Sequence, residues 1–218
     1  LEAIEVSGRE ITADALHTQR KLATYLVEQR QAHYHFSVKG NQPTLQADIE
    51  LLFRDRGQAH FIQTTSGEHG RIETRRIWCK SALNEYLDFP HVGQVFLIER
   101  ERVEKKTGQT SLEIALGITS RTPEQANPEQ VLKTNRGHWC IENSCHYTLD
   151  WNYDEDRGRI RTGFGPENVS RLRRFAIGLI KSSTQDGVAQ KMRQLCRSPR
   201  LVFDYLRMTL NSAPARAR

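Results

Sequence analysis

The sequence predicts a mixed α/β fold that contains a β-rich insertion and ends in a basic helical tail. The order strand, helix, strand over residues 10–38 is typical of parallel strands joined by a crossover. Short β-rich runs then fill residues 61–120, where Gly and polar residues separate them. Residues 157–218 carry 14 Lys and Arg against three acidic residues, and their apolar positions have helical spacing.

The first 60 residues supply the strand–helix–strand pattern. The stretch EITADA at 10–15 reads as a strand, and helical spacing follows at Leu16, Leu22 with Ala23, and Leu26 with Val27. HYHFSV at 33–38 alternates apolar and polar residues, as strands do. Pro43 then begins a short helix whose apolar positions are Leu45, Ile49 and Leu52.

The middle of the chain predicts antiparallel strands. Its runs are RIETRRIWC, GQVFLIERE and SLEIALGITS, and a turn at 105–108 separates the last two. Two roles are open for Arg71, Arg75 and Arg76 in the first run: solvated surface side chains or contacts to phosphate groups.

A helix is predicted to begin at Asn127, which can cap it, with Pro128 at its first position. The three residues His138, Glu142 and His146 follow at intervals of four and share one face. Gly137 interrupts this helix, which predicts close packing or a backbone approach there. Its apolar stripe is Val131, Leu132, Trp139, Cys145 and Leu149.

The tail predicts a second long helix after a Gly- and Arg-rich linker at 156–165. Pro166 begins it, and several arginines make it basic. The net charge of +11 over 157–218 favours a polyanionic partner, although a solvated basic surface is the alternative. The predicted buried stripe is Val169, Leu172, Phe175 with Ala176, and Leu179 with Ile180.

Composition excludes several classes of protein. No run approaches the roughly 20 apolar residues of a membrane span, and no signal pattern opens the chain, so a cytoplasmic location is expected. The four cysteines are scattered, which predicts reduced, buried thiols. Spacing within HWCIENSCH at 138–146 does not fit structural zinc.

Two carboxylates are the better candidates for chemistry. Asp14 ends a predicted strand, where open α/β sheets place their ligands, and Glu142 is acidic on an apolar, aromatic helix face. Carboxylates from different elements are what paired Mg²⁺ ions need. Capping of the helix that begins at Ala15 is an equally sound role for Asp14. The acidic run 154–156 is interpreted as a turn that pairs with nearby arginines, and Trp139 and Trp151 as core aromatics rather than base-stacking groups.

Several stretches together resemble one protein family. In chain order they are ITADALHTQRKLA, YHFSVKGNQPTL, RIETRR, RGHWCIENSCHYTLDWNYDEDRGRIRTG and PENVSRLRRFAIGLIK. They resemble the H-repeat-associated (ISAs-type) DDE transposases of bacterial insertion sequences. The resemblance implies a retroviral integrase-like, RNase H-like core that is N-terminally incomplete here: core residues 1–60, a β-rich insertion at 61–121, the core helix at 122–156 and the basic tail at 157–218.

The resemblance also implies an Asp-Asp-Glu triad that holds Mg²⁺ or Mn²⁺ and cuts and transfers DNA strands. Asp14 would be its second carboxylate and Glu142 its third. The first is expected upstream of Leu1, so this chain by itself is expected to be inactive. A non-catalytic DNA-binding relic and a nuclease of the same fold are the alternatives.

DNA, both element ends and target, is the expected partner of a homo-oligomer in the bacterial cytoplasm or nucleoid. The family often has Arg one turn before the Glu and Lys two turns after it, where this chain has His138 and Leu149. Guanidinium groups suit phosphate geometry. The candidate DNA-binding residues are Lys39, Asn41, Arg136, His138, Arg157, Arg159, Arg161, Arg173 and Arg174.

Overall fold

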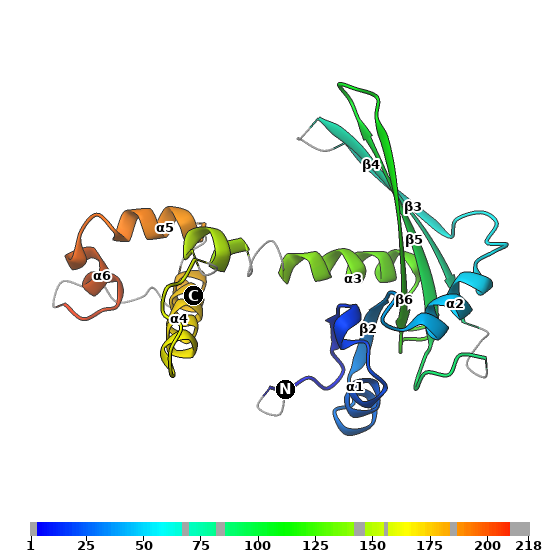
Figure 1. Ribbon diagram of the computed structural model, residues 1–218, viewed down its shortest axis with the longest axis horizontal. Coiled ribbons are helices and arrows are strands. Elements are labelled where there is room, and N and C mark those ends of the chain that lie inside the picture. Colours follow the sequence, from blue (N-terminus) through cyan, green and yellow to red (C-terminus); the bar gives the residue numbers. More distant parts are fainter. Residues whose placement is uncertain are drawn as a thin grey trace. The chain divides into compact units, whose positions relative to one another are not determined.

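A computed structural model of the chain describes residues 4–66, 70–81, 86–141, 147–154, 157–183 and 187–209. The chain divides into two compact units, Leu1–Trp139 and Cys140–Arg218 (Figure 1). Unit 1 combines a six-stranded sheet with helices, and unit 2 is helical. The predicted mixed α/β class is therefore confirmed.

The sheet of unit 1 has the strand order β1-β2-β6-β5-β4-β3. Its first two strands, β1 and β2, are parallel, and every other neighbouring pair is antiparallel. The parallel pair confirms the predicted crossover. The strands are β1 (Glu10–Ala13), β2 (His33–Val38), β3 (Phe61–Ser66), β4 (Arg71–Lys80), β5 (Gln94–Glu104) and β6 (Thr110–Thr119).

The crossover between β1 and β2 is built from short helical pieces. A 3-10 turn at Ala15–His17 precedes α1 (Arg20–Thr24), which continues into a short π-helix at Tyr25–Gln29. Leu26 is fully buried here. Leu16, expected on the buried face, is 71% exposed because the 3-10 turn that holds it is separate from α1.

The β-rich region continues the sheet that begins with β1 and β2. Strand β6 pairs with β2 from His35↔Thr119 to Val38↔Leu116, and β5, β4 and β3 follow outward. The long strands β4, β5 and β6 run past the part of the sheet that the helices cover, as Figure 1 shows. The antiparallel pairing predicted for this region is confirmed.

Each face of the sheet carries a helix and a core. On one face, α2 (Pro43–Leu52) buries Leu45 and Ile49 against a core that includes Tyr34 and Phe36. On the other face, α3 (Pro128–Ile141) packs on a second core. Its members are Ile77, Cys79, Phe96, Ile98, Ala126, Val131 and Leu132.

The start of α3 forms as the sequence predicts. Asn127 Oδ1 accepts from Gln130 N–H at 2.9 Å, and Gln130 Oε1 accepts from Asn127 N–H at 3.0 Å. This reciprocal capping box satisfies two helix-terminal donors. The first turn of α3 is thereby fixed by local sequence.

Unit 2 contains a short π-helix at Thr148–Asn152, α4 (Gly165–Ser183), α5 (Val188–Leu195) and α6 (Pro199–Tyr205). Leu149, Ile177, Ile180 and Val188 form its core. The stripe predicted on α4 is wrong for two residues: Leu172 is 67% exposed and Phe175 is 68% exposed. In the described part of the chain, no helix has both the length and the apolar character that a bilayer crossing requires.

Candidate active site

Asp14 lies directly after β1 and caps the turn that follows. His17 N–H donates to Asp14 Oδ1 at 3.3 Å, so the predicted capping role is confirmed. The residue is nevertheless exposed. A carboxylate has about four lone-pair positions, so this one cap leaves capacity for a further ligand.

The loop after β2 is bonded to the turn that Asp14 begins. Asn41 Nδ2 donates to the Ala15 carbonyl, and Gln42 Nε2 donates to the Thr18 carbonyl at 2.9 Å. Thr18 Oγ1 in turn donates to Ser37 O at 2.6 Å. The structure therefore brings the loop that carries Lys39 and Asn41, two predicted DNA-binding residues, to the Asp14 turn.

Helix α3 follows the direction of β1. Thr134 Oγ1 donates to Glu10 Oε2 at 3.1 Å, and one helical turn later His138 Nδ1 lies 3.0 Å from Thr12 Oγ1. An advance of four residues along α3 therefore matches an advance of two residues along β1. Glu10, Thr12 and Asp14 alternate along the chain, so strand geometry directs the first two to the face that α3 covers.

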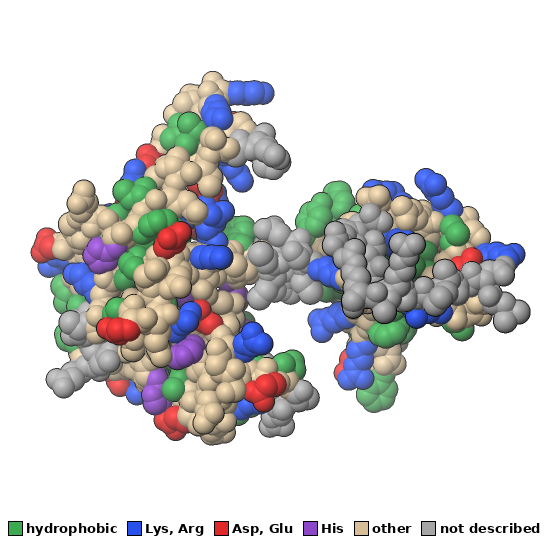
Figure 2. All heavy atoms as spheres, turned by 180° about the vertical axis from the view of Figure 1, so that it is seen from behind, with side chains coloured by type: hydrophobic (Ala, Val, Ile, Leu, Met, Phe, Trp, Pro, Cys, Tyr) green, Lys and Arg blue, Asp and Glu red, His purple; other side chains and the backbone are tan. Residues whose placement is uncertain are grey.

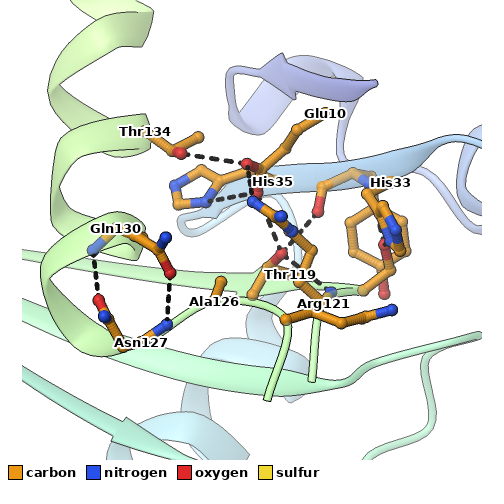
Figure 3. A network of polar contacts seen from close by, with 12 residues as sticks. Glu10, His33, His35, Thr119, Arg121, Ala126, Asn127, Gln130 and Thr134 are labelled. Atoms are coloured by element: carbon orange, nitrogen blue, oxygen red, sulfur yellow. Dashed lines mark hydrogen bonds and ion pairs between the residues drawn. The ribbon is translucent and has the colours of Figure 1, made fainter. Parts of the chain in front are cut away.

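Glu10 is a partly buried acceptor that was not predicted from the sequence. Its carboxylate lies 3.1 Å from Thr134 Oγ1 and accepts from Arg121 Nη1 at 3.3 Å, and Thr119 Oγ1 lies 3.5 Å away. Figure 3 shows these side chains converging between α3 and the sheet. The carboxylate is 15% exposed, and its contacts with Thr134 and Arg121 join β1 to α3 and to the residues that follow β6. The alternate spacing of Glu10, Thr12 and Asp14 along the sequence is the pattern that could have indicated its position on the face that α3 covers.

His35 lies beside this group and is fully buried on β2. Its Nε2 is 3.3 Å from Asn135 Oδ1, its ring stacks on Phe96 at 4.5 Å, and its Nδ1 is 3.9 Å from Glu10 Oε1. Burial lowers the pKa of His35 to about 4; the hydrogen bond to Asn135 opposes this shift, and the nearby His138 adds to it. His35 is therefore neutral at physiological pH.

The stability of unit 1 is expected to fall in acid because of His35. The unfolded chain binds this proton near pH 6.5 and the folded chain near pH 4, so the free energy of unfolding decreases as pH falls between these values. The slope from this group approaches about 1.4 kcal/mol per pH unit. Urea titrations of wild type and His35→Gln at several pH values measure it. The His35→Gln variant should be less stable throughout but should lose this slope, whereas the exposed-site control His17→Gln should retain it; equal slopes in all three contradict the assignment.

The remaining DNA-binding candidates occupy both units. Arg136 Nη1 donates to Gln63 Oε1 at 2.5 Å, which joins α3 to β3. In unit 2, Arg159, Arg161 and Arg173 line one pocket, so three of the predicted residues are brought together. Arg174 is exposed on α4, and Arg157 lies 3.6 Å from Asp154, as the predicted pairing of the acidic run requires.

Several predicted residues lie outside the described part of the chain, among them Glu142, Cys145, His146, Glu155 and Asp156. Within the described part, no group of three His, Cys, Asp or Glu side chains is arranged to hold a metal ion. Of the described thiols, Cys79 is buried as predicted, but Cys196 is exposed.

Three interpretations of this region are wrong. Trp139 is 46% exposed and Trp151 is 75% exposed, so neither is a core aromatic. The ring of Trp139 instead faces the Arg100 guanidinium at 5.4 Å. A Cβ added at Gly137 would meet no atom within 4 Å, so no close packing within the described chain requires this glycine.

Comparison with known proteins identifies relatives of the chain. No family model matches it. "Putative transposase YncI" of Escherichia coli O157:H7 is 28% identical over 89% of this chain and 52% of its own length. "H repeat-associated putative transposase YhhI" of Escherichia coli K12 is 26% identical over 89% of this chain and 53% of its own length. The resemblance to H-repeat-associated transposases is confirmed.

A further relative, "Uncharacterized protein in dhlA 3'region" of Xanthobacter autotrophicus, is 31% identical over 56% of this chain and 42% of its own length. The chain spans about half the length of the transposase relatives. Their alignment extends over most of this chain, so it takes in residues of both units.

Proposed function

We propose that this chain forms part of a DNA transposase, and that Asp14 and Glu142 supply two of the carboxylates that hold its divalent metal. The observation that carries this proposal is the register of α3 along β1. Thr134 contacts Glu10, and His138 contacts Thr12. Asp14 follows Thr12 by two residues in the sequence, just after β1 ends, and Glu142 follows His138 by four.

The surroundings of Asp14 support the same proposal. Its carboxylate is exposed and is held by the cap to His17, while Glu10 anchors α3 to β1. The loop that carries Lys39 and Asn41 is bonded to the Asp14 turn, which offers a cation and an amide donor beside a carboxylate. We propose that this parallel β1–β2 pair, together with α3, is the part of an RNase H-like core that holds the site.

The donor set suits a hard cation. Carboxylate oxygens are what Mg²⁺ and Mn²⁺ prefer, and a bound ion would activate water or a 3′ hydroxyl and neutralise charge on the phosphate. Asp14 and Glu142 would hold that ion, and Lys39 would orient the scissile phosphate as a point charge. In this reaction an oxygen nucleophile forms a new bond to phosphorus, and the leaving 3′ oxygen departs with a proton.

Strand transfer repeats this chemistry with a different nucleophile. The freed 3′ hydroxyl attacks a phosphate of target DNA, so one phosphodiester forms as another breaks. Both DNAs must be held together, which fits a homo-oligomer that acts on element ends and target. No further cofactor is required by this scheme.

A strand-cutting assay tests the proposed function. The intact protein is incubated with labelled element-end DNA in Mg²⁺ or in EDTA, and products are resolved as nicked strands and joined strands. We expect metal-dependent nicking followed by joining. Nicking without joining would favour a nuclease of the same fold, and salt-dependent binding with no metal-dependent product would favour a non-catalytic DNA-binding protein.

A further inference from the structure

Arginines face one another across two neighbouring strands of unit 1. In the β4–β5 register, Arg75 lies opposite Arg100, and Glu73 lies opposite Arg102. Like charges directly opposite on antiparallel strands repel each other. These positions continue the α3 face outward from the apolar pair Ile77↔Ile98.

Nearby glutamates neutralise part of this charge. Glu73 Oε1 pairs with Arg75 and its Oε2 lies 3.2 Å from Arg102 Nε, while Glu113 pairs with Arg100. The side chains of Arg75 and Arg100 are each only 14% exposed. Burial lowers the pKa of Arg75, the charge of Glu73 opposes this shift, and the positive charges of Arg136, Arg100 and Arg102 add to it. Among the described residues that these interactions join, the positive charges of four arginines therefore exceed the negative charges of two glutamates. The arginines are Arg75, Arg100, Arg102 and Arg136, and the glutamates are Glu73 and Glu113.

Helix α3 completes the cluster with a cation and an aromatic ring. Arg136 bonds to Gln63, an uncharged partner on β3, so its positive charge is not neutralised by that contact. Trp139 is half exposed, and the Arg100 guanidinium lies over its ring, 5.4 Å from the ring centroid. On the other side, Lys39 acts on Glu113 and lowers its pKa after the larger effect of Arg100. Lys39 and Glu113 also line one pocket, so the loop beside Asp14 lies next to the cluster.

We propose that Arg75, Arg100, Arg102 and Arg136, with Trp139, form an arginine track that binds the sugar-phosphate backbone of duplex DNA. Guanidinium groups match phosphate oxygens in a bidentate fork, and Trp139 supplies a flat surface beside them. Figure 2 shows Lys and Arg side chains along the projecting part of unit 1. The idea that the bound DNA leads into the Asp14 site rests on the proposed function. Binding of DNA to the track does not depend on that function.

A matched pair of variants on one strand tests the track. Arg75 and Arg76 are neighbours on β4 and point to opposite faces. Arg75 pairs with Glu73, and Arg76 pairs with Glu99 and Glu101. Binding of a random-sequence duplex to the full chain is measured in EDTA across a salt series. We expect Arg75→Gln to weaken binding about fivefold at moderate salt and to reduce the slope of log K against log salt by about 1.

Arg76→Gln should bind as wild type does, and Arg100→Gln should behave as Arg75→Gln does. Thermal unfolding of each variant separates lost binding from lost folding. Equal effects of Arg75→Gln and Arg76→Gln, or no DNA binding by the folded wild-type chain, would overturn the inference. Because the assay contains no metal, its outcome is independent of strand cutting. Loss of binding in Arg75→Gln therefore supports the track even if the intact protein never cuts DNA.

Discussion

Asp14→Asn should reduce Mg²⁺-dependent strand cutting by the intact protein about 10³-fold or more, because the proposed site would lose a negative metal ligand to a neutral amide. The substitution keeps the size of the side chain. It also keeps an oxygen that can accept from His17 N–H, so the turn at Ala15–His17 should form as before. The expected loss is therefore in chemistry rather than in folding.

The cutting rate of Asp14→Asn is compared with those of wild type and Asp55→Asn, a control that removes an exposed aspartate after α2. Glu142→Gln should match Asp14→Asn, and the double variant should be little worse than either alone, because both side chains are proposed to hold one ion. Cutting by Asp14→Asn at the rate of the Asp55→Asn control would remove Asp14 from the site.

Gly117→Ala should destabilise unit 1 by at least about 3 kcal/mol, at the upper end of the range for overpacked cores. A Cβ at position 117 would lie 2.1 Å from Phe96 Cζ and 2.6 Å from the Phe36 carbonyl oxygen. Phe96 is fully buried and stacks on His35, so its ring has little room to move. The Phe36 backbone on β2 cannot move away from the new methyl group without shifting the β2–β6 pairing.

Gly137→Ala is the matched control for this substitution. It adds the same methyl group in a helix where nothing lies within 4 Å of the new Cβ. It should stabilise the chain by about 0.5–1 kcal/mol, since alanine favours helix more than glycine does. Urea unfolding of both variants provides the test, and a Gly117→Ala variant as stable as wild type would contradict the packing described around Phe96.

Local features of the fold could be predicted from the sequence because neighbouring residues determine them. A few neighbouring residues determine each of three such features: the cap at Asn127, the proline start of α2 and the alternation along β2. The Asp14 cap is of the same kind. The parallel β1–β2 pair also follows from the helical crossover between them, which is too long for a hairpin.

Non-local features could not be predicted in this way. The register that sets Arg75 opposite Arg100, and the pairing of β6 with β2, depend on how distant segments meet. Glu10 was missed for the same reason, since Arg121 and Thr134 come from more than 100 residues away. Trp139 was misassigned because aromatic residues at helical spacing fit both a core and an exposed, cation-facing surface.

Iron-directed cleavage of the polypeptide tests most directly whether Asp14 and Glu142 share a metal ion. Fe²⁺ replaces Mg²⁺ in the intact protein, peroxide and ascorbate are added, and mass spectrometry locates the backbone breaks that the bound ion produces. Breaks clustered near both residues 14 and 142, lost together in either Asp14→Asn or Glu142→Gln, are the predicted result. Breaks at only one of the two positions, or breaks that persist in both variants, would contradict the shared site.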